Sequence, residues 1–256
     1  MRLSRKNLFP IHPEAGSDRA SGIVMRDVVL SRGGRRVLKH INLSLTERRI
    51  ALVGANGSGK SSLVRLINGL LTPDAGSVEV CGQAVTDIGR AMPRLVGFLF
   101  QNPDHQIIFP TVAEEIGYGL RQLGVTRREA AARALAVLQE NNCSDWAERP
   151  VSSLSEGQKQ LVCILAVLVM APRILVLDEP FASLDLATRT SFLARIDALD
   201  QQVILISHDL EAVAHYDRAV WLDGGRVVGD GPPAEVLPRY RALALERAGV
   251  LTPERL

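Results

Sequence analysis

The sequence predicts an α/β protein whose parallel sheet is covered by helices on both faces. Short apolar runs at residues 50–53, 174–177 and 203–206 indicate buried strands. Residues with helical apolar spacing follow the first run, at 63–70, and the second, at about 188–199. Strands that alternate with helices form parallel sheets with helices on both faces. A glycine-rich loop between the first strand and its helix strengthens the prediction.

The composition is that of a folded protein. The chain has 256 residues, 46% hydrophobic content and 3 Cys, which excludes disorder, collagen and a disulfide scaffold. A net charge of +2 does not support nucleic-acid binding. Scattered Cys81, Cys143 and Cys163 indicate buried or free thiols in a reducing compartment. The longest apolar run, residues 161–171, is shorter than the roughly 18 residues of a membrane span.

The N-terminal half begins with a predicted antiparallel pair. Residues 23–30 are rich in Val and Ile, and a second alternation at 41–45 follows the Gly33-Gly34 turn. Residues 96–100 form another candidate buried strand. The stretch 102–118 contains two prolines and mixed polarity, and it is expected to be irregular.

The second half starts with a compact helical part. Thr126 and Glu129 have capping-box spacing and predict a helix that starts there, and a further helix is expected at about 158–170. Residues 219–228 predict a terminal hairpin, and the tail is expected to be helical at about 243–248.

The clearest motif is a phosphate loop. Residues 54–61 read G-A-N-G-S-G-K-S and match G-x-x-x-x-G-K-[ST], in which backbone N–H groups surround phosphate oxygens. Lys60 neutralises the β- and γ-phosphates, and Ser61 supplies its hydroxyl to Mg²⁺. Such a match arises by chance in only about 1% of chains of this length. The predicted ATP-binding residues here are Gly54, Ala55, Asn56, Gly57, Ser58, Gly59, Lys60, Ser61 and Ser62.

An acidic pair follows the strand at 174–177. Asp178 is predicted to help hold Mg²⁺, and Glu179 to activate the attacking water as general base. The alternative is a solvated acidic turn. It is disfavoured because two carboxylates stand directly after four apolar residues.

Residues 154–158, L-S-E-G-Q, resemble the signature of ATP-binding cassette (ABC) ATPases, with Glu156 where the commonest form has glycine. Other motifs of that family occur in order: Gln101 at a strand end, S-L-D at 183–185, and His208 after the strand at 203–206. The resemblance spans about residues 23–231 and rests on six ordered motifs.

The resemblance implies a P-loop NTPase fold of the ABC ATPase type. This fold has a RecA-like core, an antiparallel β subdomain and an inserted α-helical subdomain at about residues 103–171. The expected boundaries are an N-terminal extension at 1–22, the nucleotide-binding domain at 23–231 and a helical tail at 232–256.

The resemblance also implies roles for single residues. Gln101 contacts Mg²⁺ or the water and senses a membrane partner. Ser155, Gly157 and Gln158 complete the ATP site of the opposite subunit in a head-to-tail dimer, although Ser155 can also be a simple helix N-cap. Asp185 lies across that interface. His208 hydrogen-bonds the γ-phosphate, whereas a lone histidine is more often structural.

One position departs from the family pattern. An aromatic residue usually stacks on adenine near the second strand, and the nearest substitute here is Arg32. Its planar guanidinium can stack on the base. We predict that Arg32 makes part of the base contact, which leaves base specificity open.

Residues 102–107 and 110–116 are similar to the energy-coupling factor group of vitamin and metal-ion importers. In that group the segment lines the groove for a coupling helix of the transmembrane protein. Residues 45–49 and 54–56 resemble the biotin members, with cobalt or nickel as the alternative cargo.

This resemblance implies a set of partners. They are a second ATPase subunit in a homodimer, a transmembrane coupling protein and a substrate-binding membrane protein, without nucleic acid. The expected location is peripheral, on the cytoplasmic face of the inner membrane.

Other classes of ABC protein fit the sequence less well. A DNA-repair ATPase has a long coiled coil between the P-loop and the signature, and sustained heptads are missing here. A nucleotide-binding regulator without turnover would tolerate loss of Glu179 or His208, and both are present. A translation-factor ATPase needs two cassettes, for which the chain is too short.

Overall fold

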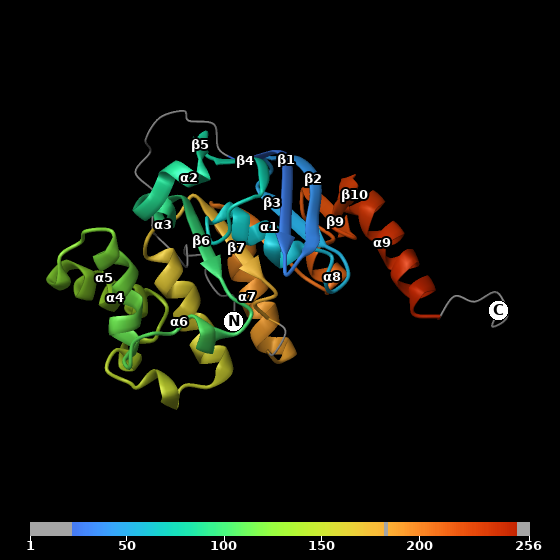
Figure 1. The fold of residues 1–256 in the computed structure, drawn as a ribbon. Coiled ribbons are helices and arrows are strands. Elements are labelled where there is room, and N and C mark those ends of the chain that lie inside the picture. The colour runs from blue at the N-terminus through green and yellow to red at the C-terminus, as the bar shows by residue number, and fades with distance from the viewer. Residues whose placement is uncertain (1–21, 182–183, 250–256) are drawn as a thin grey trace. The chain divides into compact units, whose positions relative to one another are not determined.

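The computed structural model describes residues 22–181 and 184–249 (Figure 1). These residues form two compact units. The first, which we call the P-loop unit, comprises residues 22–88 and 202–249. The second, the signature unit, comprises the described residues of 89–201. The predicted extension at 1–22 lies almost entirely outside the described residues, and the predicted domain boundaries stay a prediction.

An antiparallel sheet forms one layer of the P-loop unit. β1 (Ile23–Arg32) lies between β2 (Arg35–Leu45) and β4 (Ala75–Val80), and β5 (Gln83–Ala84) pairs with β4. The predicted antiparallel pair is therefore confirmed. The sequence did not predict β4 and β5.

A second, mixed set of strands carries the phosphate loop. β3 (Arg49–Val53) pairs in parallel with β8 (Gln202–Ile206) on one side and with β9 (Arg218–Asp223) on the other. β10 (Arg226–Gly231) pairs antiparallel with β9, which confirms the predicted terminal hairpin. Every residue of β3 is buried, as expected for a parallel strand covered on both faces.

Four helices accompany these strands in the described part of the P-loop unit. They are α1 (Lys60–Ile67), α2 (Val85–Ile88), α8 (Leu210–Val213) and α9 (Pro233–Arg247). The tail helix α9 starts ten residues before the predicted one, because Pro233 suits a first helical position and Val236 and Leu237 are buried. The end of the predicted tail, residues 250–256, lies outside the described residues.

The signature unit combines two parallel strands with helices. β6 (Val96–Leu99) pairs in parallel with β7 (Ile174–Asp178), and both strands lie where the sequence predicts them. The α-helices of this unit are α3 (Met92–Leu95), α4 (Val112–Gln122), α5 (Arg127–Glu140), α6 (Glu156–Leu168) and α7 (Leu186–Asp197). Short 3₁₀ turns are η1 (Gly89–Ala91), η2 (Pro103–His105), η3 (Ser144–Trp146) and η4 (Val151–Ser153).

The expectation of an irregular stretch at 102–118 is wrong from Val112 onward, where α4 begins. The prolines that argued against a helix, Pro103 and Pro110, both precede its first turn. Val112, Ile116 and Leu120 are buried at a spacing of four residues, which is the apolar face of a helix.

The start of α5 and the cysteines agree with the sequence. The Thr126 hydroxyl oxygen accepts the Glu129 N–H at 3.3 Å, directly before α5. Cys81, Cys143 and Cys163 are free and buried, and burial raises the pKa of the Cys163 thiol to about 12.

Within residues 22–181 and 184–249, no helix is both long and apolar enough to cross a membrane.

Candidate functional site

The phosphate loop of the P-loop unit connects β3 to α1. Its lysine is buried, with a relative exposure of 5%. Lys60 Nζ donates hydrogen bonds to the carbonyl oxygens of Gly54, at 2.7 Å, and Ala55, at 3.1 Å. The ammonium group is therefore held against the loop itself, in the place where the motif requires a cation.

Two glycines of the loop have no room for a side chain. A Cβ on Gly54 would lie 2.2 Å from the Leu222 carbonyl oxygen, and one on Gly59 would lie 2.8 Å from a Leu38 methyl carbon. Their φ angles of 148° and 109° are also in a region that favours glycine. Close packing and backbone conformation thus both favour glycine at positions 54 and 59.

Backbone hydrogen bonds tie the loop to its neighbours. The Gly225 N–H donates to the Ser58 carbonyl oxygen at 3.1 Å, and the Lys39 N–H donates to the Gly225 carbonyl oxygen at 2.8 Å. The phosphate loop, β2 and the β9–β10 turn therefore hold one another in place. Arg32 is exposed at the tip of the same β1–β2 hairpin.

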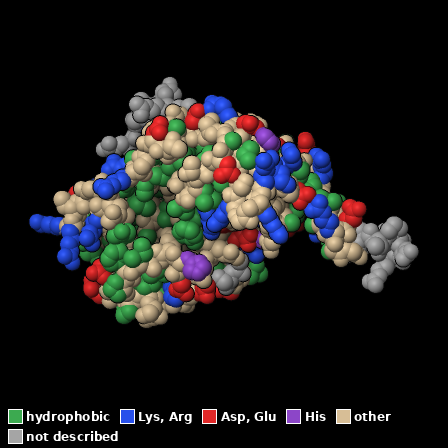
Figure 2. Space-filling view, viewed as in Figure 1, with side chains coloured by type: hydrophobic (Ala, Val, Ile, Leu, Met, Phe, Trp, Pro, Cys, Tyr) green, Lys and Arg blue, Asp and Glu red, His purple; other side chains and the backbone are tan. Residues whose placement is uncertain are grey.

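The donors of this loop fit a polyphosphate. Gly59 provides no side-chain cap for the first turn of α1, so the ligand is the natural acceptor for those N–H groups. The Ser58 hydroxyl is buried without a hydrogen-bond partner among the described residues. Lys and Arg side chains gather over β2 and β10 (Figure 2), where Arg35, Arg36 and Arg226 are exposed. Such a surface attracts anions.

His208 lies at the same end of the strands as the phosphate loop. In the parallel β3–β8 pair, Leu52 is level with Ile206, so Gly54 and His208 each stand two residues beyond that position. The Ser207 hydroxyl accepts the Asp209 N–H at 3.0 Å, which fixes the turn that carries the exposed imidazole.

The acidic pair and Gln101 meet at one end of the β6–β7 pair. Leu99 is level with Leu177, so Gln101 and Glu179 each follow by two residues. Asp178 is 8% exposed. Glu179 has a φ of 48°, a left-handed conformation that costs about 1–2 kcal/mol for a residue with a Cβ. Such strain is typical of functional positions.

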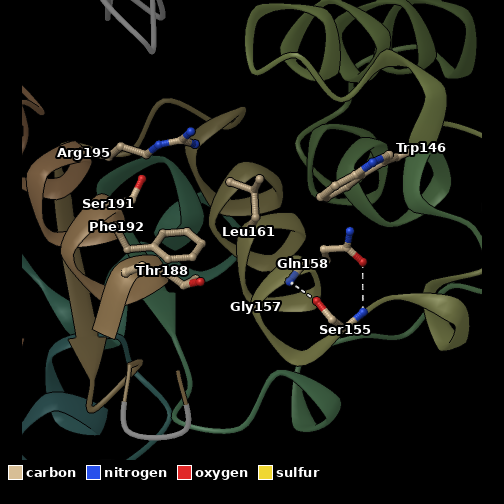
Figure 3. A pocket seen from close by; sticks show the side chains of 10 residues that line it. Trp146, Ser155, Gly157, Gln158, Leu161, Thr188, Ser191, Phe192 and Arg195 are labelled. Carbon is tan, nitrogen blue, oxygen red and sulfur yellow. Dashed lines mark hydrogen bonds between the residues drawn. The ribbon is translucent and has the colours of Figure 1, made fainter. Parts of the chain in front are cut away.

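The signature residues start α6. The Ser155 hydroxyl oxygen accepts the Gln158 N–H at 3.3 Å, and the Gln158 side-chain oxygen accepts the Ser155 N–H at 3.0 Å (Figure 3). This is a complete capping box, so the N-cap role of Ser155 is real. A Cβ on Gly157 would lie 3.2 Å from a Thr188 methyl carbon, and this closeness brings the starts of α6 and α7 together.

Asp185 is the N-cap of α7. Its carboxylate accepts the Thr188 N–H at 3.0 Å and the Thr188 hydroxyl at 2.7 Å. These hydrogen bonds, the backbone one first, hold the pKa of Asp185 below its usual value. Ser183 of the same motif lies outside the described residues.

The structure brings the predicted residues together in two groups. The P-loop unit contains Arg32, His208 and residues 54–62. The signature unit contains Gln101, Asp178, Glu179, Ser155, Gly157, Gln158 and Asp185. The catalytic, nucleotide and metal roles of these residues stay predictions.

Sequence reasoning missed Glu115, a buried carboxylate with 5% exposure on α4. Its Oε2 accepts the N–H groups of Ile108, at 2.9 Å, and Phe109, at 2.8 Å. These bonds hold the loop that exposes Ile108, whose relative exposure is 69%. The sequence feature that could have revealed the burial of Glu115 is its position three residues after Val112, on the apolar face of the helix.

Further side-chain contacts tie the segment 102–109 to α6. Asp104 pairs with Lys159 at 2.6 Å. The Gln106 side chain accepts the Phe100 N–H at 3.3 Å and donates to the Cys163 carbonyl oxygen at 3.4 Å. The segment after Gln101 is therefore attached to the helix that begins at the signature.

The sequence model of the ABC transporter family matches residues 38–182, more than half of the chain. The chain belongs to the ABC transporter family. It is 52% identical over 224 residues to the biotin transport ATP-binding protein BioM of Rhodobacter capsulatus, covering 87% of this chain and 96% of that protein. It is 38% identical to the energy-coupling factor transporter ATP-binding protein EcfA1 of Bacillus subtilis, covering 82% and 76%.

A solved structure agrees with these relatives. The chain matches cbiO1 of Clostridium perfringens, described as part of the ABC transporter complex cbiONQ, with a TM-score of 0.73 and 29% identity over 90% of this chain and 97% of that one. The predicted α/β fold of the ABC ATPase type is thereby confirmed. The protein is an ATP-binding and ATP-hydrolysing member of this family of transporter ATPases.

The Lys60 contact predicts a loss of nucleotide binding. Lys60→Ala removes the buried cation, and a charge-assisted hydrogen bond contributes about 1.5–3 kcal/mol, so the Kd for ATP should rise about 10- to 100-fold. Equilibrium titration with a fluorescent ATP analogue measures this. Lys159→Ala is the matched control and should bind normally. Unchanged affinity in Lys60→Ala would show that the cation lies outside the phosphate site.

The position of Arg32 predicts a contribution to base binding. Arg32→Ala should weaken ATP binding about 2- to 30-fold, because a cation–π contact contributes about 0.5–2 kcal/mol. Arg32→Lys keeps the charge but loses the planar group and should recover only part of the affinity. Tripolyphosphate has no base, so its affinity should change less than that of ATP. Equal losses for both ligands would contradict base stacking.

Proposed function

We propose that this ATPase energises biotin import through an energy-coupling factor transporter. The observation that carries the proposal is its 52% identity to a biotin transport ATP-binding protein across 96% of that protein's length. A second biotin transport ATP-binding protein, BioM of Rhizobium etli, is 40% identical. The segment 102–109 exposes Ile108 while hydrogen bonds and an ion pair attach it to α4 and α6, which supports a role in coupling to a membrane partner.

The proposed working form is a head-to-tail homodimer with two ATP molecules between the protomers. Each ATP would contact residues 54–62 and Arg32 of one protomer. It would also contact Ser155, Gly157, Gln158 and Asp185 of the other. The starts of α6 and α7 lie side by side at Gly157 and Thr188, and two helix N-termini favour a phosphate group.

The oxygen groups present fit Mg²⁺. Ser61, Asp178 and Gln101 offer a hydroxyl, a carboxylate and an amide oxygen, which are the hard ligands that this ion prefers. When bound, Mg²⁺ neutralises charge that develops on the transferred phosphoryl group. The buried carboxylate of Asp178 would provide the protein's negative charge in that site.

The proposed hydrolysis uses three side chains. Glu179 accepts a proton from the attacking water, and Gln101, level with it in the β6–β7 register, helps to position that water. His208 donates a hydrogen bond to the γ-phosphate from the strand end beside the phosphate loop. These roles position the reactants and stabilise charge, which dominates phosphoryl transfer.

The proposed coupling surface is the segment 102–116. Glu115 holds the backbone beside exposed Ile108, and Asp104 and Gln106 attach the segment to α6. A transmembrane coupling protein that docks here would move α6, whose first turn carries the signature. A separate substrate-binding membrane protein would capture biotin. The ATPase would be peripheral, docked on the cytoplasmic face of the inner membrane.

Transport by the reconstituted complex tests the proposal. Vesicles that contain the wild-type ATPase and both membrane proteins should accumulate labelled biotin when ATP is supplied on the ATPase side. Glu179→Gln should bind ATP and remain dimeric. Its hydrolysis rate should fall about 10²- to 10⁴-fold, since a general base contributes about that much, and uptake should be lost.

Labelled cobalt and nickel are the competing cargoes, and uptake of these ions without biotin would overturn the substrate assignment. Normal turnover in Glu179→Gln would overturn the general base.

The contacts of Glu115 predict a defect in coupling. Glu115→Ala leaves two N–H groups without their acceptor, which costs about 1–3 kcal/mol each if they stay buried. The ratio of partner-stimulated to basal ATPase activity should therefore fall several-fold. Glu115→Gln keeps an acceptor oxygen and should recover part of the ratio. Glu140→Ala, at an exposed carboxylate on α5 outside the segment 102–116, is the matched control. An unchanged ratio in Glu115→Ala would contradict the role of this loop in docking.

A further inference from the structure

A pocket of about 430 Å³ lies in the signature unit, between α6, α7 and the η3 turn. Its walls include Trp146, Gln158, Leu161, Ser191, Phe192 and Arg195 (Figure 3). A volume of this size suits a small organic ligand. The biotin-import proposal assigns no role to most of these side chains.

The polar groups of the pocket are mainly donors. Arg195 contributes a guanidinium, Trp146 an indole N–H and Ser191 a hydroxyl, and none of the lining residues is acidic. The side-chain oxygen of Gln158 is engaged by the Ser155 N–H, which leaves its NH₂ group as a donor. A donor-rich wall without carboxylates favours an anionic ligand.

The charge of Arg195 is available to a ligand. Its side chain donates one long hydrogen bond, of 3.5 Å, to the Asn141 side-chain oxygen, and it forms no ion pair with a carboxylate among the described residues. By contrast, Arg218 and Arg247 each bind a carboxylate with two N–H groups. A guanidinium fork matches the two oxygens of a carboxylate or phosphate.

The remaining walls are flat and apolar. Phe192 and Trp146 point toward Leu161 and Gln158 from opposite sides in Figure 3. Phe192 stacks on Phe181 with ring centroids 5.7 Å apart, and Arg149 lies 5.8 Å from the centre of the Trp146 ring. Both rings are thereby held in place. Fixed aromatic walls favour a planar ring in the ligand.

We propose that this pocket binds a small molecule in which a planar ring carries one anionic group, with the anion on Arg195 and the ring against Trp146, Leu161 and Phe192. Aromatic carboxylates and nucleoside monophosphates both have this chemistry. The binding step does not depend on the transport function, because the pocket is formed within the signature unit alone.

The pocket is lined in part by residues of the signature. Gln158 and Gly157 line it from α6, and Thr188 lines it from α7, next to the hydrogen bonds of Asp185. A bound molecule would hold the starts of these two helices together. We therefore expect it to change the ATPase rate, and this second step rests on the proposed roles of Ser155 and Asp185.

Trp146 is a built-in reporter for the binding experiment. The chain has 2 Trp, so Trp221→Phe leaves Trp146 as the single emitter. Lys60→Ala, added to this background, weakens binding to the phosphate loop. AMP and nicotinate are the probes that distinguish a phosphate from a carboxylate. Adenosine and inorganic phosphate each supply only half of the required chemistry.

The expected result is a saturable change in Trp146 emission with AMP, nicotinate or both, at concentrations up to about 10 mM. Adenosine and phosphate should bind at least about 10-fold more weakly, and Arg195→Gln should lose at least about 10-fold in affinity. Arg195→Lys keeps the charge and should lose less. Arg128→Gln, an exposed arginine on α5, is the matched control and should bind normally.

Two results would overturn the inference. One is the absence of a saturable signal with both probes, and the other is equal affinity in Arg195→Gln while that variant keeps the wild-type unfolding temperature. An unchanged ATPase rate at saturating probe would overturn only the link to the signature. Biotin uptake is measured without either probe, so its failure and the failure of this pocket are separate outcomes.

Discussion

Backbone atoms approach one another around three glycines, and the arrangement of the P-loop unit depends on this contact. A Cβ on Gly54 would meet the Leu222 carbonyl oxygen at 2.2 Å, and one on Gly225 would meet the Val37 carbonyl oxygen at 2.3 Å. A Cβ on Gly59 would lie 2.8 Å from a Leu38 methyl carbon and 3.1 Å from the Val37 carbonyl oxygen. The hairpin β1–β2, the β9–β10 turn and the phosphate loop can therefore bond through their backbones. This is why the lysine and the helix start are placed without help from a large side chain.

The signature unit positions its polar residues in a different way, through strand register and helix caps. The β6–β7 register brings Gln101 level with Glu179. Ser155 and Asp185 each cap the helix that they start, so their side chains are fixed by local hydrogen bonds. A capped helix start still directs its positive end outward, and capping is compatible with a role at a phosphate.

Local patterns account for the parts of the molecule that the sequence predicted. The strand–loop–helix around Lys60 and the helix start at Ser155 depend on neighbours within a few residues, and both form as expected. The helix α4 was missed because Pro103 and Pro110 outweighed its apolar spacing, although both precede it. Glu115 accepts N–H groups that lie six and seven residues earlier in the chain, which no helical spacing predicts. Arg195 bonds to Asn141 and lines one pocket with Trp146 only through tertiary folding.

Helix α6 contacts the segment 102–116 and also lines the pocket. The strength of each contact between α6 and the segment decides which of these contacts can transmit motion. The Asp104 carboxylate of the ion pair with Lys159 is 63% exposed, and such a pair contributes about 1 kcal/mol or less. Cys163 and Pro103 are buried against each other, and Gln106 bonds to the α6 backbone. Moving a buried, closely packed contact costs more free energy than breaking an exposed ion pair. Closely packed interiors also transmit strain. Movement of the docking segment should therefore reach the signature through Pro103, Gln106 and Cys163 more than through charge.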